Sequence, residues 1–124
     1  TTMGILEKVR AHAGDVDFEV QPELVSLLSS GDFGRYADEK GEMSVCFISN
    51  NDITGGNSGS AMFNARGELL GLAFDGNWEA MSSDILYEPK MQRTIGVDVR
   101  YMLFMIEKYG KAGNLIQELK ITNP

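Results

Sequence analysis

The segment Thr54–Ser60 reads Thr-Gly-Gly-Asn-Ser-Gly-Ser and contains the residues of this chain best suited to chemistry. In acyl transfer the substrate carbonyl oxygen becomes negative, and two converging backbone N–H groups can stabilise it. The N–H groups of Gly56 and Ser58 are spaced to supply that pair, because glycine adopts φ values that are closed to other residues. Ser58 is therefore the candidate nucleophile. An ordinary Gly/Ser loop between strands explains the heptad equally well.

The residues after the heptad favour a strand–turn–strand. Two short apolar runs, residues 60–63 and 68–74, flank the turn-forming segment Asn64–Gly67, which predicts a β-hairpin. A nucleophile-elbow esterase would instead need a helix directly after the serine and glycine two places away on each side. Ser60 occupies one of those places, so that pattern is incomplete. A hairpin after Gly-Asn-Ser-Gly resembles the C-terminal barrel of trypsin-like serine proteases.

Further segments of the chain make the resemblance more specific, to one family. Together with the heptad, residues 71–79, 92–95 and 97–101 resemble the C-terminal end of the bacterial trypsin-fold dipeptidyl peptidases, the family of dipeptidyl peptidases 7 and 11. The likeness extends from residues 32–36 to residues 115–119. It implies a mainly β fold with flanking helices: the C-terminal β-barrel half of a chymotrypsin-fold, double-barrel serine peptidase, followed by a C-terminal helix.

The same resemblance assigns roles to two residues downstream of Ser58. Asp75 would grip the free N-terminal amine of the substrate, and Gly76 would form a wall of the pocket for the side chain that precedes the cut. Glycine leaves that pocket open and apolar and indicates the type 7 branch, whereas arginine marks relatives that cut after Asp or Glu. Without the resemblance, Asp75-Gly76 is only a hairpin turn signal.

The function implied is a serine-type dipeptidyl peptidase that removes N-terminal dipeptides from oligopeptides, with an apolar residue before the cut. This chain would supply the nucleophile and part of the specificity pocket. The histidine and aspartate would come from the upstream N-terminal barrel of a longer parent, so the isolated 124 residues are predicted to be inactive. The alternatives are a trypsin-like endopeptidase of the glutamyl type and a non-catalytic β domain.

Two polar residues limit other chemistry. His12 is the only histidine, which excludes a zinc site with two histidines, and neither metal nor cofactor is expected. A trypsin-like base would come from the other barrel, so His12 is predicted to be a solvated helix residue. Asn57 stands where trypsin-like digestive enzymes have aspartate. Because an amide cannot form an ion pair with a new N-terminal ammonium, activation by that route is not expected.

Composition and charge constrain the partners. Eighteen acidic and eleven basic residues give a net charge of −7, which argues against nucleic acid. The chain has no apolar run near the ~20 residues that span a membrane. Cys46 is the only cysteine, lies in an apolar run and is predicted to be a buried strand residue, which leaves the redox compartment open. The resemblance implies peptide substrates, a homodimeric parent as an option, and a periplasmic or cell-surface location in a Gram-negative bacterium.

Apolar periodicity divides the chain into three predicted parts. Residues 1–35 form a helical lead-in, with Pro22 at a helix start and Gly31 as a stop. Residues 36–99 form the serine-bearing β-barrel half, because short apolar runs there are broken by Gly, Asn and Asp. Residues 100–124 form a C-terminal helical segment, in which the helical period begins near Val99 and Gly110 is a stop.

Overall fold

The computed structural model describes residues 1–82 and 85–122. These form two compact units. The first combines Thr1–Val45 with Leu103–Lys120, and the second contains Cys46–Met102 together with the segment that starts at Ile121. The boundaries after residues 35 and 99, which follow periodicity, stay a prediction.

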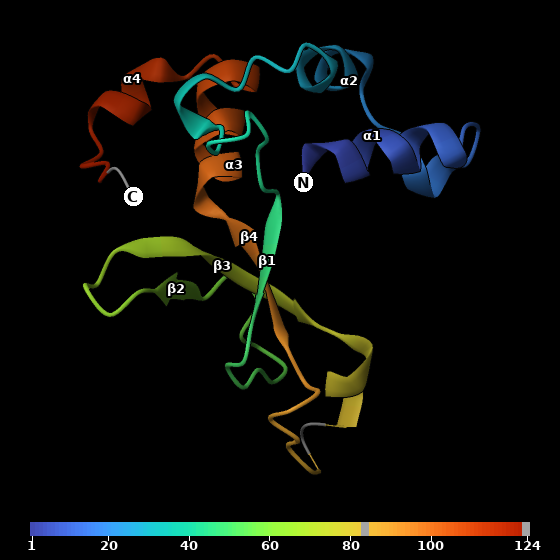
Figure 1. The fold of residues 1–124 in the computed structure, drawn as a ribbon, viewed down its shortest axis with the longest axis vertical. Coiled ribbons are helices and arrows are strands. Elements are labelled where there is room, and N and C mark those ends of the chain that lie inside the picture. The colour runs from blue at the N-terminus through green and yellow to red at the C-terminus, as the bar shows by residue number, and fades with distance from the viewer. Residues whose placement is uncertain (83–84, 123–124) are drawn as a thin grey trace. The chain divides into compact units, whose positions relative to one another are not determined.

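The second unit is built on one antiparallel sheet of four strands (Figure 1). The strand order is β1-β4-β3-β2, so the two central strands are β3 and β4. The mainly β character predicted for this part of the chain is therefore confirmed. The double-barrel architecture stays a prediction. The strands are β1 (Cys46–Ser49), β2 (Ala61–Phe63), β3 (Leu69–Gly76) and β4 (Thr94–Asp98).

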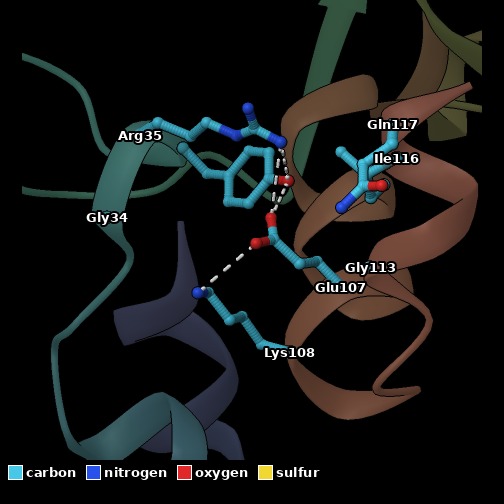
Figure 2. A pocket seen from close by; sticks show the side chains of 8 residues that line it. Gly34, Arg35, Glu107, Lys108, Gly113, Ile116 and Gln117 are labelled. Atoms are coloured by element: carbon cyan, nitrogen blue, oxygen red, sulfur yellow. Dashed lines mark hydrogen bonds and ion pairs between the residues drawn. The ribbon is translucent and has the colours of Figure 1, made fainter. Parts of the chain in front are cut away.

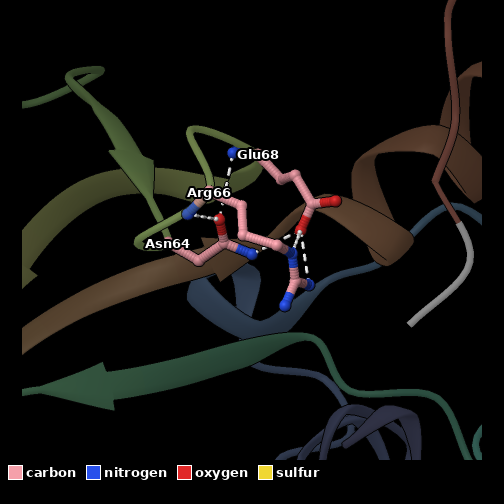
Figure 3. Close-up of polar contacts among 3 residues, drawn as sticks. All are labelled: Asn64, Arg66 and Glu68. Atoms are coloured by element: carbon pink, nitrogen blue, oxygen red, sulfur yellow. Dashed lines mark hydrogen bonds and ion pairs between the residues drawn. The ribbon is translucent and has the colours of Figure 1, made fainter.

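The predicted hairpin is confirmed as β2 and β3, and its turn is held by side chains (Figure 3). The Asn64 Oδ1 accepts hydrogen bonds from the backbone N–H groups of Arg66, at 2.8 Å, and Glu68, at 3.1 Å. The Glu68 carboxylate in turn accepts from the Arg66 guanidinium at 2.6 Å and from Asn64 Nδ2 at 2.5 Å. Asparagine favours such turns because its side chain bonds to nearby backbone. The turn therefore fixes the start of β3.

The sheet core depends on a glycine in β4. A Cβ atom on Gly96 would lie 2.7 Å from the Met62 sulfur and 2.9 Å from the Phe47 ring. Real Cβ atoms do not approach other atoms so closely, so the side chains from the edge strands β1 and β2 pack over this position only because it is glycine.

The first unit is helical, as predicted for the start and the end of the chain. Pro22 occupies the first turn of its helix, and Gly31, at φ +69°, follows the helix end. Phe104 is fully buried, and the rings of Phe33 and Tyr36 meet it edge-on at 5.7 and 6.2 Å. The helical segments of the chain are α1 (Thr2–Ala11), η1 (Val16–Phe18), α2 (Pro22–Ser29), η2 (Gly34–Tyr36), η3 (Trp78–Ser82), α3 (Val99–Phe104), the π-helical η4 (Met105–Tyr109) and α4 (Gly113–Gln117).

The predicted solvent exposure of two residues, Cys46 and His12, is wrong. Cys46 lies in β1, as expected, but is exposed. Side chains alternate along a strand, so Cys46 shares a face with Ile48, which is 67% exposed, while Phe47 turns to the core. His12 is not a solvated helix residue either. It caps α1, is half-buried, and its ring stacks on Phe18 with centroids 4.0 Å apart.

Among the described residues, none of the helices has the length and apolar character needed to cross a membrane.

Candidate active site

One pocket in the second unit brings together three of the four predicted site residues. Ser58, Asp75 and Gly76 line a cavity of about 280 Å³. Gly56, the fourth, lies in the same loop as Ser58. The other lining residues are Ile53, Thr54, Gly55, Phe74, Asn77, Ala80 and Met81.

The loop that carries Ser58 is braced by Asn57. Its side-chain Oδ1 accepts from the Thr54 backbone N–H at 2.9 Å and from the Thr54 hydroxyl at 3.3 Å. Its backbone N–H donates to the Thr54 carbonyl at 3.2 Å, and its carbonyl accepts from Ser60 N at 2.9 Å. Asn57 thus holds the loop from within.

Two backbone hydrogen bonds tie this loop to the sheet. The Gly59 N–H donates to the Ala73 carbonyl at 2.7 Å, and the Ala73 N–H donates to the Ser60 carbonyl at 2.9 Å. The ladder between β2 and β3 therefore continues into the loop. Ser58 is consequently placed next to the C-terminal part of β3.

The Ser58 hydroxyl is exposed and only weakly held. Its Oγ lies 3.4 Å from the Phe74 carbonyl oxygen, beyond the usual 2.5–3.0 Å for such a bond. Gly56 adopts φ +93°, the left-handed region that favours glycine. In the part of the chain that the structure describes, no acceptor meets the backbone N–H groups of Gly56 and Ser58. Both residues are exposed.

Asp75 and Gly76 end β3 and do not form a hairpin turn. Asp75 pairs with Ile95, and Gly76 pairs with Thr94, so the turn alternative is wrong. A β-bulge at Phe74 shifts the register between Ala73 and Asp75, and bulges re-aim side chains beside functional sites. The exposed Asp75 carboxylate accepts from the Gly76 N–H through Oδ1 at 2.8 Å. Among the described residues its Oδ2 has no partner.

Sequence reasoning missed a residue that frames the pocket wall, Asn77. Its backbone N–H donates to the Arg93 carbonyl at 2.9 Å, and its Oδ1 accepts from Arg93 N at 2.8 Å. Its Nδ2 donates to the Met91 carbonyl at 2.9 Å and to the Glu79 carboxylate at 2.7 Å. An asparagine at a strand end is a turn signal in sequence, but these distant partners are visible only in the fold.

A second missed residue, Gln92, organises the segment that returns to β4. It is 3% exposed. Its Nε2 donates to the Leu86 carbonyl at 3.0 Å, and its Oε1 accepts from Glu88 N at 2.9 Å. A buried amide with both ends satisfied fixes the local backbone.

A larger cavity of about 510 Å³ lies in the first unit, and none of its described lining residues is a serine, threonine or cysteine (Figure 2). There the Tyr36 hydroxyl donates to the Glu107 carboxylate, and the Arg35 and Lys108 side chains each lie 3.5 Å from it. The Tyr36 hydrogen bond is the main cause that lowers the pKa of Glu107, while burial raises the pKa of Tyr36. These groups satisfy one another, so the Ser58 pocket is the better candidate for catalysis.

Among the described residues, no three His, Cys, Asp or Glu side chains lie close enough together to hold a metal ion.

Comparison with known proteins places the chain in a family. Residues 1–121 match the model of the Peptidase S46 family. The chain belongs to this family. It is 57% identical over 121 residues to dipeptidyl-peptidase 7 of Porphyromonas endodontalis, which covers 98% of this chain and 14% of that protein. It is 49% identical over 121 residues to the Asp/Glu-specific dipeptidyl-peptidase of Capnocytophaga gingivalis, which covers 98% of this chain and 17% of that protein.

Solved structures agree with the fold. The chain matches the crystal structure of Porphyromonas endodontalis DPP11 in complex with the dipeptide Arg-Glu at a TM-score of 0.88 and 44% identity, covering 94% of this chain and 16% of that one. The complex with Arg-Asp gives a TM-score of 0.89 at 43% identity, covering 95% and 17%. The chain thus spans about one sixth of these relatives, and the resemblance to the dipeptidyl peptidase family is confirmed.

Proposed function

We propose that this chain is the serine-bearing part of a longer dipeptidyl peptidase that removes N-terminal dipeptides from oligopeptides. The observation that carries the proposal is the single pocket lined by Ser58, Asp75 and Gly76. Membership of the S46 family supports the peptidase class, and the names of its relatives support dipeptide release.

In the proposed mechanism Ser58 is the nucleophile. Its Oγ attacks the second peptide carbonyl and gives its proton to a histidine of the upstream barrel, which an aspartate of that barrel orients. The N–H groups of Gly56 and Ser58 stabilise the oxyanion. Collapse of the intermediate releases the shortened peptide, which takes the proton as its new amine, and water then hydrolyses the dipeptidyl ester. The weak hold on the Ser58 hydroxyl and its open neighbouring N–H groups fit these roles.

Asp75 binds the protonated N-terminal amine of the substrate in this proposal. Its Oδ1 already accepts from the Gly76 N–H, which orients the carboxylate and leaves Oδ2 for the amine. Because the amine sits at a fixed place relative to Ser58, the cut falls after the second residue.

An apolar residue before the cut suits the pocket walls. Ile53, Ala80 and Met81 line the cavity beside Gly76, and none of its described lining residues carries a positive charge. A cation is what a pocket for Asp or Glu would need. The identities point the same way: 49–57% to relatives named dipeptidyl-peptidase 7 and 44–49% to those named Asp/Glu-specific.

We infer the remaining properties of the parent from the family resemblance. They are a double-barrel trypsin-like fold, a periplasmic or cell-surface location in a Gram-negative bacterium, peptide substrates and homodimer formation. No cofactor enters the mechanism.

Replacing the nucleophile in the intact parent tests the proposal. Ser58→Ala should lower kcat on the order of 10⁴- to 10⁶-fold. Ser60→Ala, two residues away in the same exposed loop, is the matched control and should retain activity. A serine-directed fluorophosphonate should modify Ser58, as located by mass spectrometry of the digested protein. Full activity of the Ser58→Ala parent would leave the non-catalytic β domain as the better description of this chain.

A further inference from the structure

The pocket wall contains a close contact between β3 and the short helix η3. A Cβ atom built on Gly76 would lie 2.9 Å from the Ala80 Cβ and 3.6 Å from the Ile53 Cγ2. The first distance is shorter than real Cβ contacts, whereas the second is ordinary van der Waals contact. The space at residue 76 is therefore limited by Ala80 and not by Ile53.

Ala80 cannot retreat from this contact without moving backbone. Its Cβ is bonded directly to the main chain, so it has no flexible end to swing away. Its N–H donates to the Asn77 carbonyl at 2.9 Å. The Asn77 side chain accepts from the Arg93 N–H at 2.8 Å and donates to the Met91 carbonyl at 2.9 Å. The wall that carries Ala80 is thus fixed, through Asn77, to the segment that leads into β4.

We propose that Ala80 is a second specificity-determining residue, which sets the depth of the pocket jointly with Gly76 for an apolar side chain before the cut. This inference rests on the proposed function. A methyl group at residue 80 and a hydrogen at residue 76 together leave the cavity its size, and both residues line it. Adding a methyl at residue 76 forces the wall to shift, and removing the one at residue 80 makes room.

A methyl-transposition cycle in the intact parent tests this coupling. The variants are Gly76→Ala, Ala80→Gly and the double variant, which moves one methyl from residue 80 to residue 76. Gly76→Ala should lower kcat/KM for substrates with Phe or Leu before the cut by about 10- to 200-fold, the range for one methylene in an apolar pocket. Substrates with Ala there should lose less. The double variant should recover most of the Phe and Leu activity, because contacting residues are not additive.

Controls separate the pocket effect from a general effect of the substitution. Gly4→Ala makes the same change at a glycine in α1 where an added Cβ would meet no atom within 4 Å, and should keep the selectivity without lowering the melting temperature, because alanine favours a helix over glycine. The melting temperature should fall for Gly76→Ala and return in the double variant. Additive losses in the cycle, for both selectivity and melting temperature, would overturn the inference while leaving the proposed function intact.

Failure of the proposed function can be distinguished from failure of the inference about Ala80. If the unmodified parent cuts no free-amine peptide, the proposed function fails and the specificity role falls with it. The melting temperatures of Gly76→Ala, Ala80→Gly and the double variant would then still test whether residues 76 and 80 are in contact. If the parent cuts such peptides but Ala80→Gly leaves the Phe to Ala preference unchanged in both backgrounds, only the inference about Ala80 is overturned.

Discussion

Substitution of Asp75 by asparagine in the intact parent should lower kcat/KM for free-amine peptides by about 10- to 150-fold. The side chain keeps its shape, and the amide oxygen can still accept from the Gly76 N–H as the Asp75 Oδ1 does at 2.8 Å. What changes is the second oxygen, which becomes an NH₂ group that faces the substrate amine donor to donor. A hydrogen bond to a charged group is worth about 1.5–3 kcal/mol, and each 1.4 kcal/mol is tenfold.

Initial rates on a dipeptidyl fluorogenic substrate from about pH 6 to pH 9.5 measure this effect. An N-terminal amine titrates with a pKa near 8, so kcat/KM of the unmodified parent should fall above that pH, while the Asp75→Asn profile should be flatter there. Asp52→Asn is the matched control, since Asp52 is exposed and does not line the pocket. If Asp75→Asn slowed cleavage of amine-blocked and free peptides equally, the carboxylate would act on the pocket and not on the amine.

Three further outcomes are expected. The purified 124 residues should not turn over any dipeptidyl substrate, because the proposed mechanism takes its histidine and aspartate from another part of the parent; robust turnover would contradict this. In the parent, Gly76→Arg should depress cleavage after Phe or Leu, and should raise cleavage after Asp or Glu only together with Ala80→Gly, given the 2.9 Å Cβ contact; a switch by Gly76→Arg alone would show that the wall yields. Hydrogen bonding from Tyr36 lowers the pKa of folded Glu107, so this group stabilises the fold above its unfolded pKa and loses that effect as pH falls through the folded value. The melting temperature of Glu107→Gln should therefore lie below that of the parent at pH 7 and converge with it at acid pH; a constant difference would argue against this linkage.

Local signals in the sequence predicted the elements that local chemistry specifies. The turn Asn64–Gly67 predicts its hairpin because the asparagine side chain bonds to backbone only a few residues away. Pro22 predicts a helix start because its missing N–H is not needed there. The loop 54–60 was identified from glycine spacing, and Gly56 does adopt positive φ.

Features that depend on distant partners were not predictable in this way. An apolar run around Cys46 does not reveal which face of the strand meets the core. The run therefore predicts a buried Cys46, whereas the residue is exposed. The stacking of His12 on Phe18 joins two helical segments across a turn. Asn77 and Gln92 look like ordinary loop polar residues until the fold brings their backbone partners to them. The pairing of Asp75 with Ile95 likewise needed the β3–β4 register, which the sequence does not specify.

The most direct test of the central claim compares matched peptides that differ only at the N terminus. Intact parent is incubated with a free-amine oligopeptide and with its N-acetylated form, each with Phe or Leu as the second residue, and mass spectrometry locates the cut. The account predicts release of a dipeptide from the free peptide and a loss of at least about 10- to 150-fold on acetylation, which removes the charged partner of Asp75. That loss should not add to the loss from Asp75→Asn, because both delete the same contact. Equal rates on the two peptides, or cuts inside the acetylated one, would contradict the account and favour a trypsin-like endopeptidase.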